Sequence, residues 1–304
     1  MKAERPTGLL ASPSQSLVVW WTAIRPRTLS IAATPVALGS ALAWADGASP
    51  VWTVLLATLA CALLIQVGTN LHNDVADFER GTDRPDRVGP LRVTAAGWVQ
   101  PASVRMAARS SFGLALLLGF YLVVQGGWPI LLMGMASLVA GWSYSGGARP
   151  ISHTAWGEVF VLVFFGLVAV AGSHWLQQGD AWVDALLCGF IVGFPAAAVL
   201  LVNNFRDVEN DLRSGRHTLA ARLGDAGSQQ AYAAMVLLPL VLAGVLAWHG
   251  RPGVLLAAMA APYAWSLVSR LTRGAGGSAL NALLGATARL GLVLGVLLSV
   301  GVFL

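Results

Sequence analysis

Eight of the 14 acidic residues lie in two short windows of this sequence, and an asparagine opens each window. The first window has the spacing NxxxDxxD and the second has the spacing NxxxDxxxD. Residues at i, i+4 and i+7 or i+8 share one face of a helix, so each motif predicts a compact patch of side-chain oxygens. The residues of the two patches are Asn70, Asp74 and Asp77, and Asn203, Asp207 and Asp211.

The chemistry of these patches suggests a metal ion and phosphate. Carboxylates held close together repel one another in a medium of low dielectric constant, so a cation is expected between the patches. Mg²⁺ is the favoured ion, because it binds hard oxygen ligands and is often held by one or two carboxylates together with substrate phosphates. Arginines interleaved with the motifs can hold the remaining phosphate charge. They are Arg84, Arg87, Arg92, Arg206, Arg213 and Arg216.

The composition of the chain is that of a membrane protein. Of its 304 residues 56% are hydrophobic and 11% are charged, whereas a soluble domain carries about 25% charged residues. This balance excludes a soluble globular enzyme, a disordered chain and a coiled coil. The 34 glycines are scattered through apolar runs, which indicates close helix packing in lipid. The sequence therefore predicts an all-α, polytopic membrane protein.

Nine apolar segments are long enough, or nearly so, to cross a bilayer that requires about 20 helical residues. They predict a single bundle of about nine transmembrane helices over residues 16–304, preceded by a mobile tail of residues 1–15. The nine segments are 28–44, 51–71, 103–124, 129–144, 156–176, 182–202, 229–248, 253–269 and 279–304.

The distribution of positive charge predicts the orientation of the bundle. Seventeen of the 19 Lys and Arg residues fall on one side of the nine segments, Arg251 alone falls on the other, and Arg289 lies within the last segment. Since cytoplasmic loops carry the excess of positive charge, the N-terminus is expected in the cytoplasm and the C-terminus outside. Tryptophans at the opposite ends of the segments agree with this orientation. Both acidic motifs then end even-numbered segments, so the two patches are expected to face each other at the cytoplasmic side.

Two other interpretations of the motifs remain open. Asp and Asn at a helix end often form only a solvated terminus or a cap, although the matched spacing of the two motifs argues against this. Paired carboxylates can also serve a cation-coupled transporter, whose sites lie near the middle of the membrane. Against this alternative, the carboxylates lie at one side of the membrane, and only Gln66 and Arg289 lie clearly deep in the segments.

With this pair of motifs on nine segments, the chain resembles the UbiA superfamily of intramembrane prenyltransferases from about Trp21 to Leu304. Within the superfamily it is most similar to the 1,4-dihydroxy-2-naphthoate polyprenyltransferase branch. The segments that carry the resemblance are NDVAD (73–77) with GTDRPDRVGPLR (81–92), VNNFRDVEND (202–211) with GRHTLAARLG (215–224), RPRTL (25–29) and YSGGARP (144–150). There is one departure: the family's first motif often has a further Asp where this chain has Gly81, with Asp83 two residues later.

The resemblance implies a UbiA-type fold and a Mg²⁺-dependent reaction in the bacterial cytoplasmic (inner) membrane, with the active site facing the cytoplasm. A polyprenyl group would pass from polyprenyl diphosphate to 1,4-dihydroxy-2-naphthoate with loss of carbon dioxide, giving the precursor of demethylmenaquinone for menaquinone biosynthesis. Another aromatic acceptor, such as 4-hydroxybenzoate or homogentisate, remains an alternative. The expected partners are these substrates and the lipid bilayer, with no nucleic acid and no obligate protein partner.

The resemblance also implies roles for individual residues. The four aspartates of the motifs would hold Mg²⁺ on the diphosphate, while Asn70 and Asn203 orient it and Tyr144 surrounds the allylic cation with its ring. The further substrate contacts are Arg25, Asp83, Arg84, Arg87, Arg149, Arg213 and Arg216. Membrane anchoring remains an alternative role for Arg25, Arg149 and Tyr144. Arg289 is expected to face the interior of the bundle, because an unpaired charge facing lipid is costly.

Overall fold

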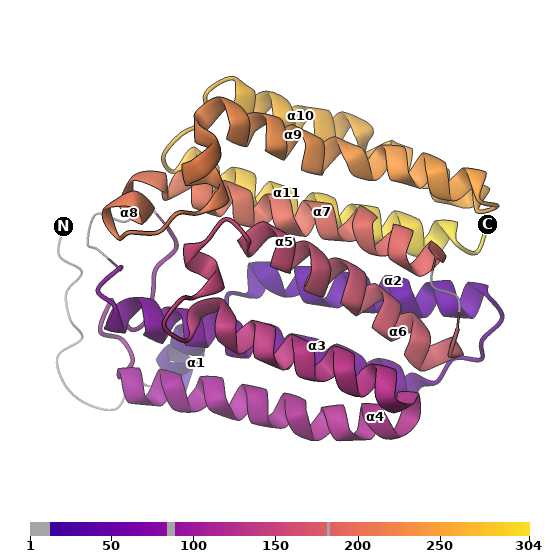
Figure 1. The fold of residues 1–304 in the computed structure, drawn as a ribbon, viewed down its shortest axis with the longest axis horizontal. Helices are drawn as coiled ribbons and strands as arrows, with labels where there is room; N and C mark the ends of the chain where they lie inside the picture. Colours follow the sequence, from indigo (N-terminus) through magenta and orange to yellow (C-terminus); the bar gives the residue numbers. More distant parts are fainter. Residues whose placement is uncertain (1–12, 84–88, 181–182) are drawn as a thin grey trace.

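The chain folds into a bundle of helices, as its composition predicts (Figure 1). The structure is a computed structural model that describes residues 13–83, 89–180 and 183–304, and no strand occurs within these ranges. The α-helices are α1 (Pro13–Ile24), α2 (Leu29–Ala45), α3 (Trp52–Glu79), α4 (Pro101–Ser145), α5 (Gly157–Leu162), α6 (Ala169–Gln178), α7 (Val183–Arg206), α8 (Val208–Arg213), α9 (Leu219–Trp248), α10 (Ala261–Thr272) and α11 (Ala279–Gly301). Between them lie the 3₁₀ turns η1 (Pro26–Thr28), η2 (Ile151–His153) and η4 (Pro252–Ala260) and the π-helical turn η3 (Val163–Val168). Of the expected N-terminal tail, residues 1–12 lie outside the described residues, and residues 13–15 belong to α1.

Helix α4 contains two of the predicted membrane crossings. It runs for 45 residues, about 68 Å at the helical rise of about 1.5 Å per residue, which is roughly twice the hydrocarbon thickness of a bilayer. Gly127 breaks it with the non-helical dihedral angles φ 69° and ψ −157°. The rings of Phe112 and Trp142 lie 5.9 Å apart, so the two halves of α4 run back alongside each other. Among the described residues, the eight helical stretches long enough to span a membrane therefore make nine crossings.

All the crossings run along the long axis of the molecule (Figure 1). The C-terminal ends of α3 and α7 lie at one end of the bundle together with α8, and the C-terminus of the chain lies at the other. We call these the site end and the far end. Trp248, at the far end of α9, is 91% exposed, which suits an indole at a membrane interface.

Two buried cores and one close contact between backbones hold the bundle together. A large buried core connects α2 and α6 with α7, α9, α10 and α11, and a smaller one joins α3 with α1 and the first half of α4. A Cβ atom added to Gly166 in η3 would lie 2.5 Å from the carbonyl oxygen of Gly189 in α7. Glycine is therefore required where η3 meets α7, in agreement with the interpretation of the glycine content.

The expectation for Arg289 is wrong, because its side chain is exposed on the outside of α11. The neighbouring positions Ala288 and Leu290 are buried and hold the helix against the bundle, so the packing of α11 turns residue 289 outward. A long arginine stem can still carry its charge toward the membrane interface, which reduces the cost of the exposed position.

Candidate active site

One face of α3 carries a stripe of polar side chains into the interior of the bundle. Gln66, Asn70, Asn73 and Asp77 follow the helical spacing i, i+4, i+7 and i+11, and all four line one cavity. Asp77, at the site end of the stripe, is 1% exposed. The NxxxDxxD spacing predicts Asn70 and Asp77 on one face. It does not predict Asn73 there, although Asn73 follows Gln66 at i+7 in the sequence.

Asp74 lies off this face, and the expectation that it shares the patch is wrong. Its two carboxylate oxygens accept hydrogen bonds from the backbone N–H groups of Val93 and Thr94, each at 3.1 Å. The side chain is 2% exposed and does not line the cavity. Packing of the turn at 92–94 against α3 therefore decides the direction of Asp74, and the carboxylate holds that turn in place.

The turn held by Asp74 brings Arg92 into the site. The Arg92 guanidinium donates to Asp77 Oδ2 and to Asn73 Oδ1, each at 2.7 Å, and its Nε lies 3.0 Å from Asp83 Oδ1. Burial acts to lower the pKa of Arg92, but the surrounding carboxylates, Asp77 foremost, outweigh burial and hold the pKa above its ordinary value. Arg92 is therefore a permanent positive charge inside the site, and Asp83 lies beside it in the cavity wall.

The second motif lies where α7 ends. Helix α7 stops at Arg206, Asp207 has non-helical dihedral angles, and α8 starts at the next residue. Despite this break, Asn203, Asp207 and Asp211 all line the cavity. Arg206, whose side chain is 1% exposed, donates to both carboxylate oxygens of Asp207 at 2.8 and 2.6 Å and to Asn203 Oδ1 at 2.9 Å.

Arg216 joins the two motifs across the cavity. Its guanidinium forms an ion pair with Asp77 from the first motif, and its Nη1 lies 3.7 Å from Asp211 Oδ1 in the second. The Asn210 side chain adds a hydrogen bond of 3.3 Å to the Thr82 carbonyl oxygen. The two acidic patches thus face each other at the site end, and guanidinium groups of arginine lie between them.

The oxygen atoms of this site suit Mg²⁺ in type. Carboxylate and amide oxygens from both motifs line one end of the cavity, and these are the hard ligands that Mg²⁺ prefers. Within the described ranges, however, no three carboxylates, imidazoles or thiolates are grouped closely enough to hold an ion. The carboxylates are instead paired with Arg92, Arg206 and Arg216.

The other residues expected in the site are divided between the cavity and the surface. Tyr144 at the end of α4 and Arg25 before η1 line the cavity. Arg25 has φ 55°, which is unusual for a residue other than glycine. Arg149 is exposed, and Arg213 is 54% exposed and pairs with Glu209, so neither lines the cavity. Arg84 and Arg87 lie outside the described residues.

Sequence reasoning missed several groups beside the cavity. Glu158, 1% exposed in the first turn of α5, accepts a hydrogen bond of 2.9 Å from the Asn204 amide, which lines the cavity. In η2, burial and the charge of Arg216 lower the pKa of His153 to about 4, so the ring is neutral near pH 7. The His217 backbone N–H donates to the His153 carbonyl oxygen at 2.9 Å, which anchors the loop that carries Arg216.

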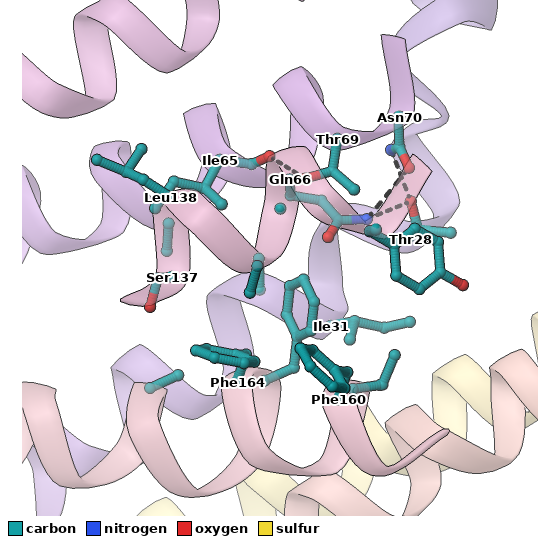
Figure 2. Close-up of a pocket in the computed structure, with 18 of the residues that line it drawn as sticks. Thr28, Ile31, Ile65, Gln66, Thr69, Asn70, Ser137, Leu138, Phe160 and Phe164 are labelled. Carbon is teal, nitrogen blue, oxygen red and sulfur yellow. Dashed lines mark hydrogen bonds between the residues drawn. The ribbon is translucent and has the colours of Figure 1, made fainter. Parts of the chain in front are cut away.

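Beyond the polar end, the same cavity becomes apolar and continues along the bundle. Its volume is about 390 Å³. Figure 2 shows its middle, where Phe160 and Phe164 face Ile31 and the polar stripe of α3. The lining continues to Thr58, which lies 19 residues before Asp77 on α3, a distance of about 28 Å along a helix. The cavity therefore joins a charged end to a long apolar tunnel.

These features define a helical membrane protein with a buried site in which carboxylates and arginines meet at one end of a cavity. The chain belongs to the UbiA prenyltransferase family, whose model matches residues 32–301. It is 37% identical over 264 residues to the 1,4-dihydroxy-2-naphthoate octaprenyltransferase of Mycobacterium tuberculosis, covering 86% of this chain and 89% of the relative. It is 32% identical over 294 residues to the Escherichia coli K12 protein of the same name, covering 94% and 95%.

A solved structure shows the same fold. A UbiA homolog from Archaeoglobus fulgidus, bound to GPP and Mg²⁺, superposes with a TM-score of 0.67 at 14% identity, covering 93% of this chain and 99% of that one. The helical bundle of this chain therefore has the fold of that homolog.

Proposed function

We propose that this protein transfers a polyprenyl group from polyprenyl diphosphate to 1,4-dihydroxy-2-naphthoate, with loss of carbon dioxide, in the synthesis of menaquinone. The observation that carries the proposal is one cavity, which is charged at the site end, extends about 28 Å along α3 from Asp77 to Thr58, and has a mostly apolar lining away from the charged end. The charged end suits a diphosphate and the apolar part suits its polyprenyl chain. The relatives named 1,4-dihydroxy-2-naphthoate octaprenyltransferase support the choice of acceptor.

At the charged end, Asp77, Asp207 and Asp211 are the proposed Mg²⁺ ligands, because their side chains line the cavity. When bound, the metal supplies Lewis-acid stabilisation of the departing diphosphate. Arg92 and Arg216 form ion pairs with Asp77. With a metal ion on the carboxylates, the same guanidinium groups would be available to the phosphate oxygens. Asp74 is assigned to the support of the Arg92 turn rather than to the metal.

The remaining residues have roles in binding and in protecting the reaction. Asn203 lines the cavity beside the diphosphate position, whereas the Asn70 amide is engaged by the Ile24 carbonyl oxygen and Thr28. Ionisation of the donor leaves an allylic cation, which water would quench, and the apolar wall excludes water from it. The ring of Tyr144 is available at the cavity wall to stabilise that cation. The ring carbon that bears the carboxylate then bonds to the cation, and carbon dioxide leaves with the aromatic electrons restored.

The proposed setting is the bacterial cytoplasmic membrane, with the site end and the N-terminus toward the cytoplasm. The arginines of the site lie at one end of the bundle, and Arg251 lies at the far end. More positive charge at the site end than at the far end is expected if the site end faces the cytoplasm.

The test is an assay of the purified protein in detergent with Mg²⁺, a polyprenyl diphosphate and either 1,4-dihydroxy-2-naphthoate or 4-hydroxybenzoate. Mass spectrometry of the lipid extract should show a prenylated naphthol that has lost the carboxylate. Asp77→Asn and Asp207→Asn should each reduce the rate by on the order of 10²-fold or more, because charge at the reacting centre is lost. Asp225→Asn, an exposed acid on α9, should leave the rate unchanged.

The other outcomes separate the parts of the proposal. A prenylated hydroxybenzoate that keeps its carboxylate would preserve the reaction type and reject the acceptor. Consumption of neither acceptor, with no release of pyrophosphate, would reject the function.

A further inference from the structure

A chain of hydrogen bonds fixes one amide group deep in the cavity, and it begins at the unusual backbone of Arg25. The Thr28 hydroxyl donates to the Arg25 carbonyl oxygen at 2.9 Å, so the Thr28 Oγ1 lone pairs are left to accept. Asn70 Nδ2 donates to the Ile24 carbonyl oxygen at 2.9 Å and to Thr28 Oγ1 at 3.2 Å. Because both partners accept, the nitrogen of the Asn70 amide must face them.

The orientation of Asn70 determines that of Gln66, one helical turn deeper. With its nitrogen committed, Asn70 turns Oδ1 toward Gln66, whose Nε2 lies 3.4 Å from it and 3.3 Å from Thr28 Oγ1. Both neighbours accept hydrogen bonds, so Gln66 must present its nitrogen to them and its oxygen to the cavity. Figure 2 shows the Gln66 oxygen directed away from this network, and no hydrogen bond to it is found among the described residues.

The cavity wall opposite this oxygen is apolar and is formed by flat aromatic rings. The rings of Phe160 and Phe164 lie on the opposite wall with centroids 5.7 Å apart and planes tilted by 33°, and Ile31 lies beside them. Leaving an acceptor atom without a donor in such surroundings is unfavourable. A polyprenyl chain has no donor to offer. An aromatic acceptor substrate has one, the hydrogen of a ring hydroxyl, and its flat ring suits the phenylalanine wall.

The position of Gln66 along the helix fits the same ligand. Gln66 lies 11 residues before Asp77 and 7 before Asn73 on one face of α3, about 16 Å and about 10 Å along the axis. A diphosphate bound at Asp77 has its reactive carbon within a few bonds of the phosphates. A fused aromatic ring that meets this carbon would extend from it toward Gln66.

We propose that Gln66 Oε1 accepts a hydrogen bond from a ring hydroxyl of the aromatic acceptor, and that Asn70 and Thr28 are positioning residues that orient the amide. This inference rests on the proposed function. In 1,4-dihydroxy-2-naphthoate the 1-hydroxyl can bond internally to the neighbouring carboxylate, so the 4-hydroxyl is the free donor. The cavity thereby selects acceptors that carry a free hydroxyl meta to the ring carbon that reacts.

The experiment compares two acceptors on two enzymes. 1,4-Dihydroxy-2-naphthoate and its 4-O-methyl ether are similarly electron-rich, but only the first can donate from the 4-position. The wild-type enzyme should prefer the hydroxyl acceptor in kcat/KM by about 10- to 100-fold, the usual effect of an unmatched buried acceptor. In Gln66→Met this preference should fall to within about threefold, while KM for the polyprenyl diphosphate stays the same.

Ser137→Ala is the matched control. Ser137 also lines the cavity, but its hydroxyl is satisfied by the Met133 carbonyl oxygen at 2.7 Å, so this variant should keep the wild-type preference. Equilibrium binding gives a second readout that requires no turnover. Loss of the 4-hydroxyl, from the dihydroxy acid to 1-hydroxy-2-naphthoate, should weaken binding to the wild-type protein by about tenfold or more and to Gln66→Met much less.

Two results would overturn the inference. The first is an unchanged hydroxyl preference in Gln66→Met, whether or not the rates with both acceptors fall. The second is equal binding of the dihydroxy and monohydroxy acids to the wild-type protein. Failure of the proposed function would look different, because wild-type protein would then prenylate another acceptor.

Discussion

Asp74→Asn and Asp77→Asn should have different effects, although the two residues are three apart in one motif. Asp74 accepts backbone hydrogen bonds from Val93 and Thr94 and does not line the cavity, whereas Asp77 lines it and pairs with arginine. Asp74→Asn should therefore weaken the turn that carries Arg92, while Asp77→Asn should weaken the metal and diphosphate site.

The size of the Asp74→Asn effect follows from its contacts. Asparagine keeps one acceptor oxygen but places an NH₂ group against a backbone N–H, so one of the two 3.1 Å hydrogen bonds is lost. A hydrogen bond to a charged group contributes about 1.5–3 kcal/mol, so the free energy of unfolding should fall by about 2 kcal/mol. The apparent Tm in detergent should then fall by roughly 5 °C. We expect the rate to fall by about tenfold as Arg92 loses its position, which corresponds to about 1.4 kcal/mol in the barrier.

The assay is release of pyrophosphate over a range of Mg²⁺ concentrations, with thermal unfolding measured on the same samples. Asp74→Asn should leave the Mg²⁺ concentration for half-maximal rate unchanged. Asp77→Asn should raise that concentration, because a proposed metal ligand is lost. If Asp74→Asn instead raises the Mg²⁺ requirement with no change in Tm, Asp74 is a metal ligand and the reasoning from its hydrogen bonds fails.

Two further predictions concern other parts of the bundle. At the far end, Arg251 pairs with two partly buried carboxylates, Asp46 at the end of α2 and Asp184 in α7. Arg251→Leu should therefore lower the free energy of unfolding by about 2 kcal/mol and Tm by several degrees. Arg273→Leu, which changes an exposed arginine, should leave both unchanged. An unchanged Tm in Arg251→Leu would show that this cluster contributes no stability. The pKa of His153 is lowered from an ordinary 6.5 to about 4 in the folded protein. As the pH falls below 6.5, the unfolded chain therefore binds a proton at His153 before the folded protein does. The contribution of neutral His153 to stability is complete above pH 6.5 and is lost as the pH falls toward 4. The Tm of His153→Gln should therefore fall less between pH 7 and pH 5 than the Tm of the wild-type protein.

The membrane class and the general location of the site were predictable from the sequence because they depend on local properties. Hydrophobic content and segment length determine which segments can enter a bilayer. The break within α4 was predicted too, since the apolar run is interrupted near Gly127 and Pro129. Both acidic motifs follow an even number of crossings, and parity alone places them at the same end of the bundle.

Which side chains of the first motif enter the cavity was not predictable from the sequence. Asp74 and Asp77 differ by three residues, about 300° around a helix of 3.6 residues per turn, so they lie on neighbouring parts of one helix surface. Sequence spacing does not say where the middle of the buried face lies. Contact with the 92–94 turn, distant in sequence from α3, turned Asp74 away and left Asn73 in the cavity wall. Arg289 shows the same limit, because the packing of α11 decided its direction.

By itself, then, the sequence determined a helical membrane bundle with two carboxylate motifs gathered at one end, because hydrophobicity, helical period and the parity of crossings are properties of the chain alone. Only the tertiary structure decided that Arg92 and Arg216 occupy the space between the motifs, and that backbone carbonyls near Arg25 orient Gln66 toward the cavity. These arrangements depend on hydrogen bonds and ion pairs between segments far apart in the chain. Their geometry exists only once the helices have packed.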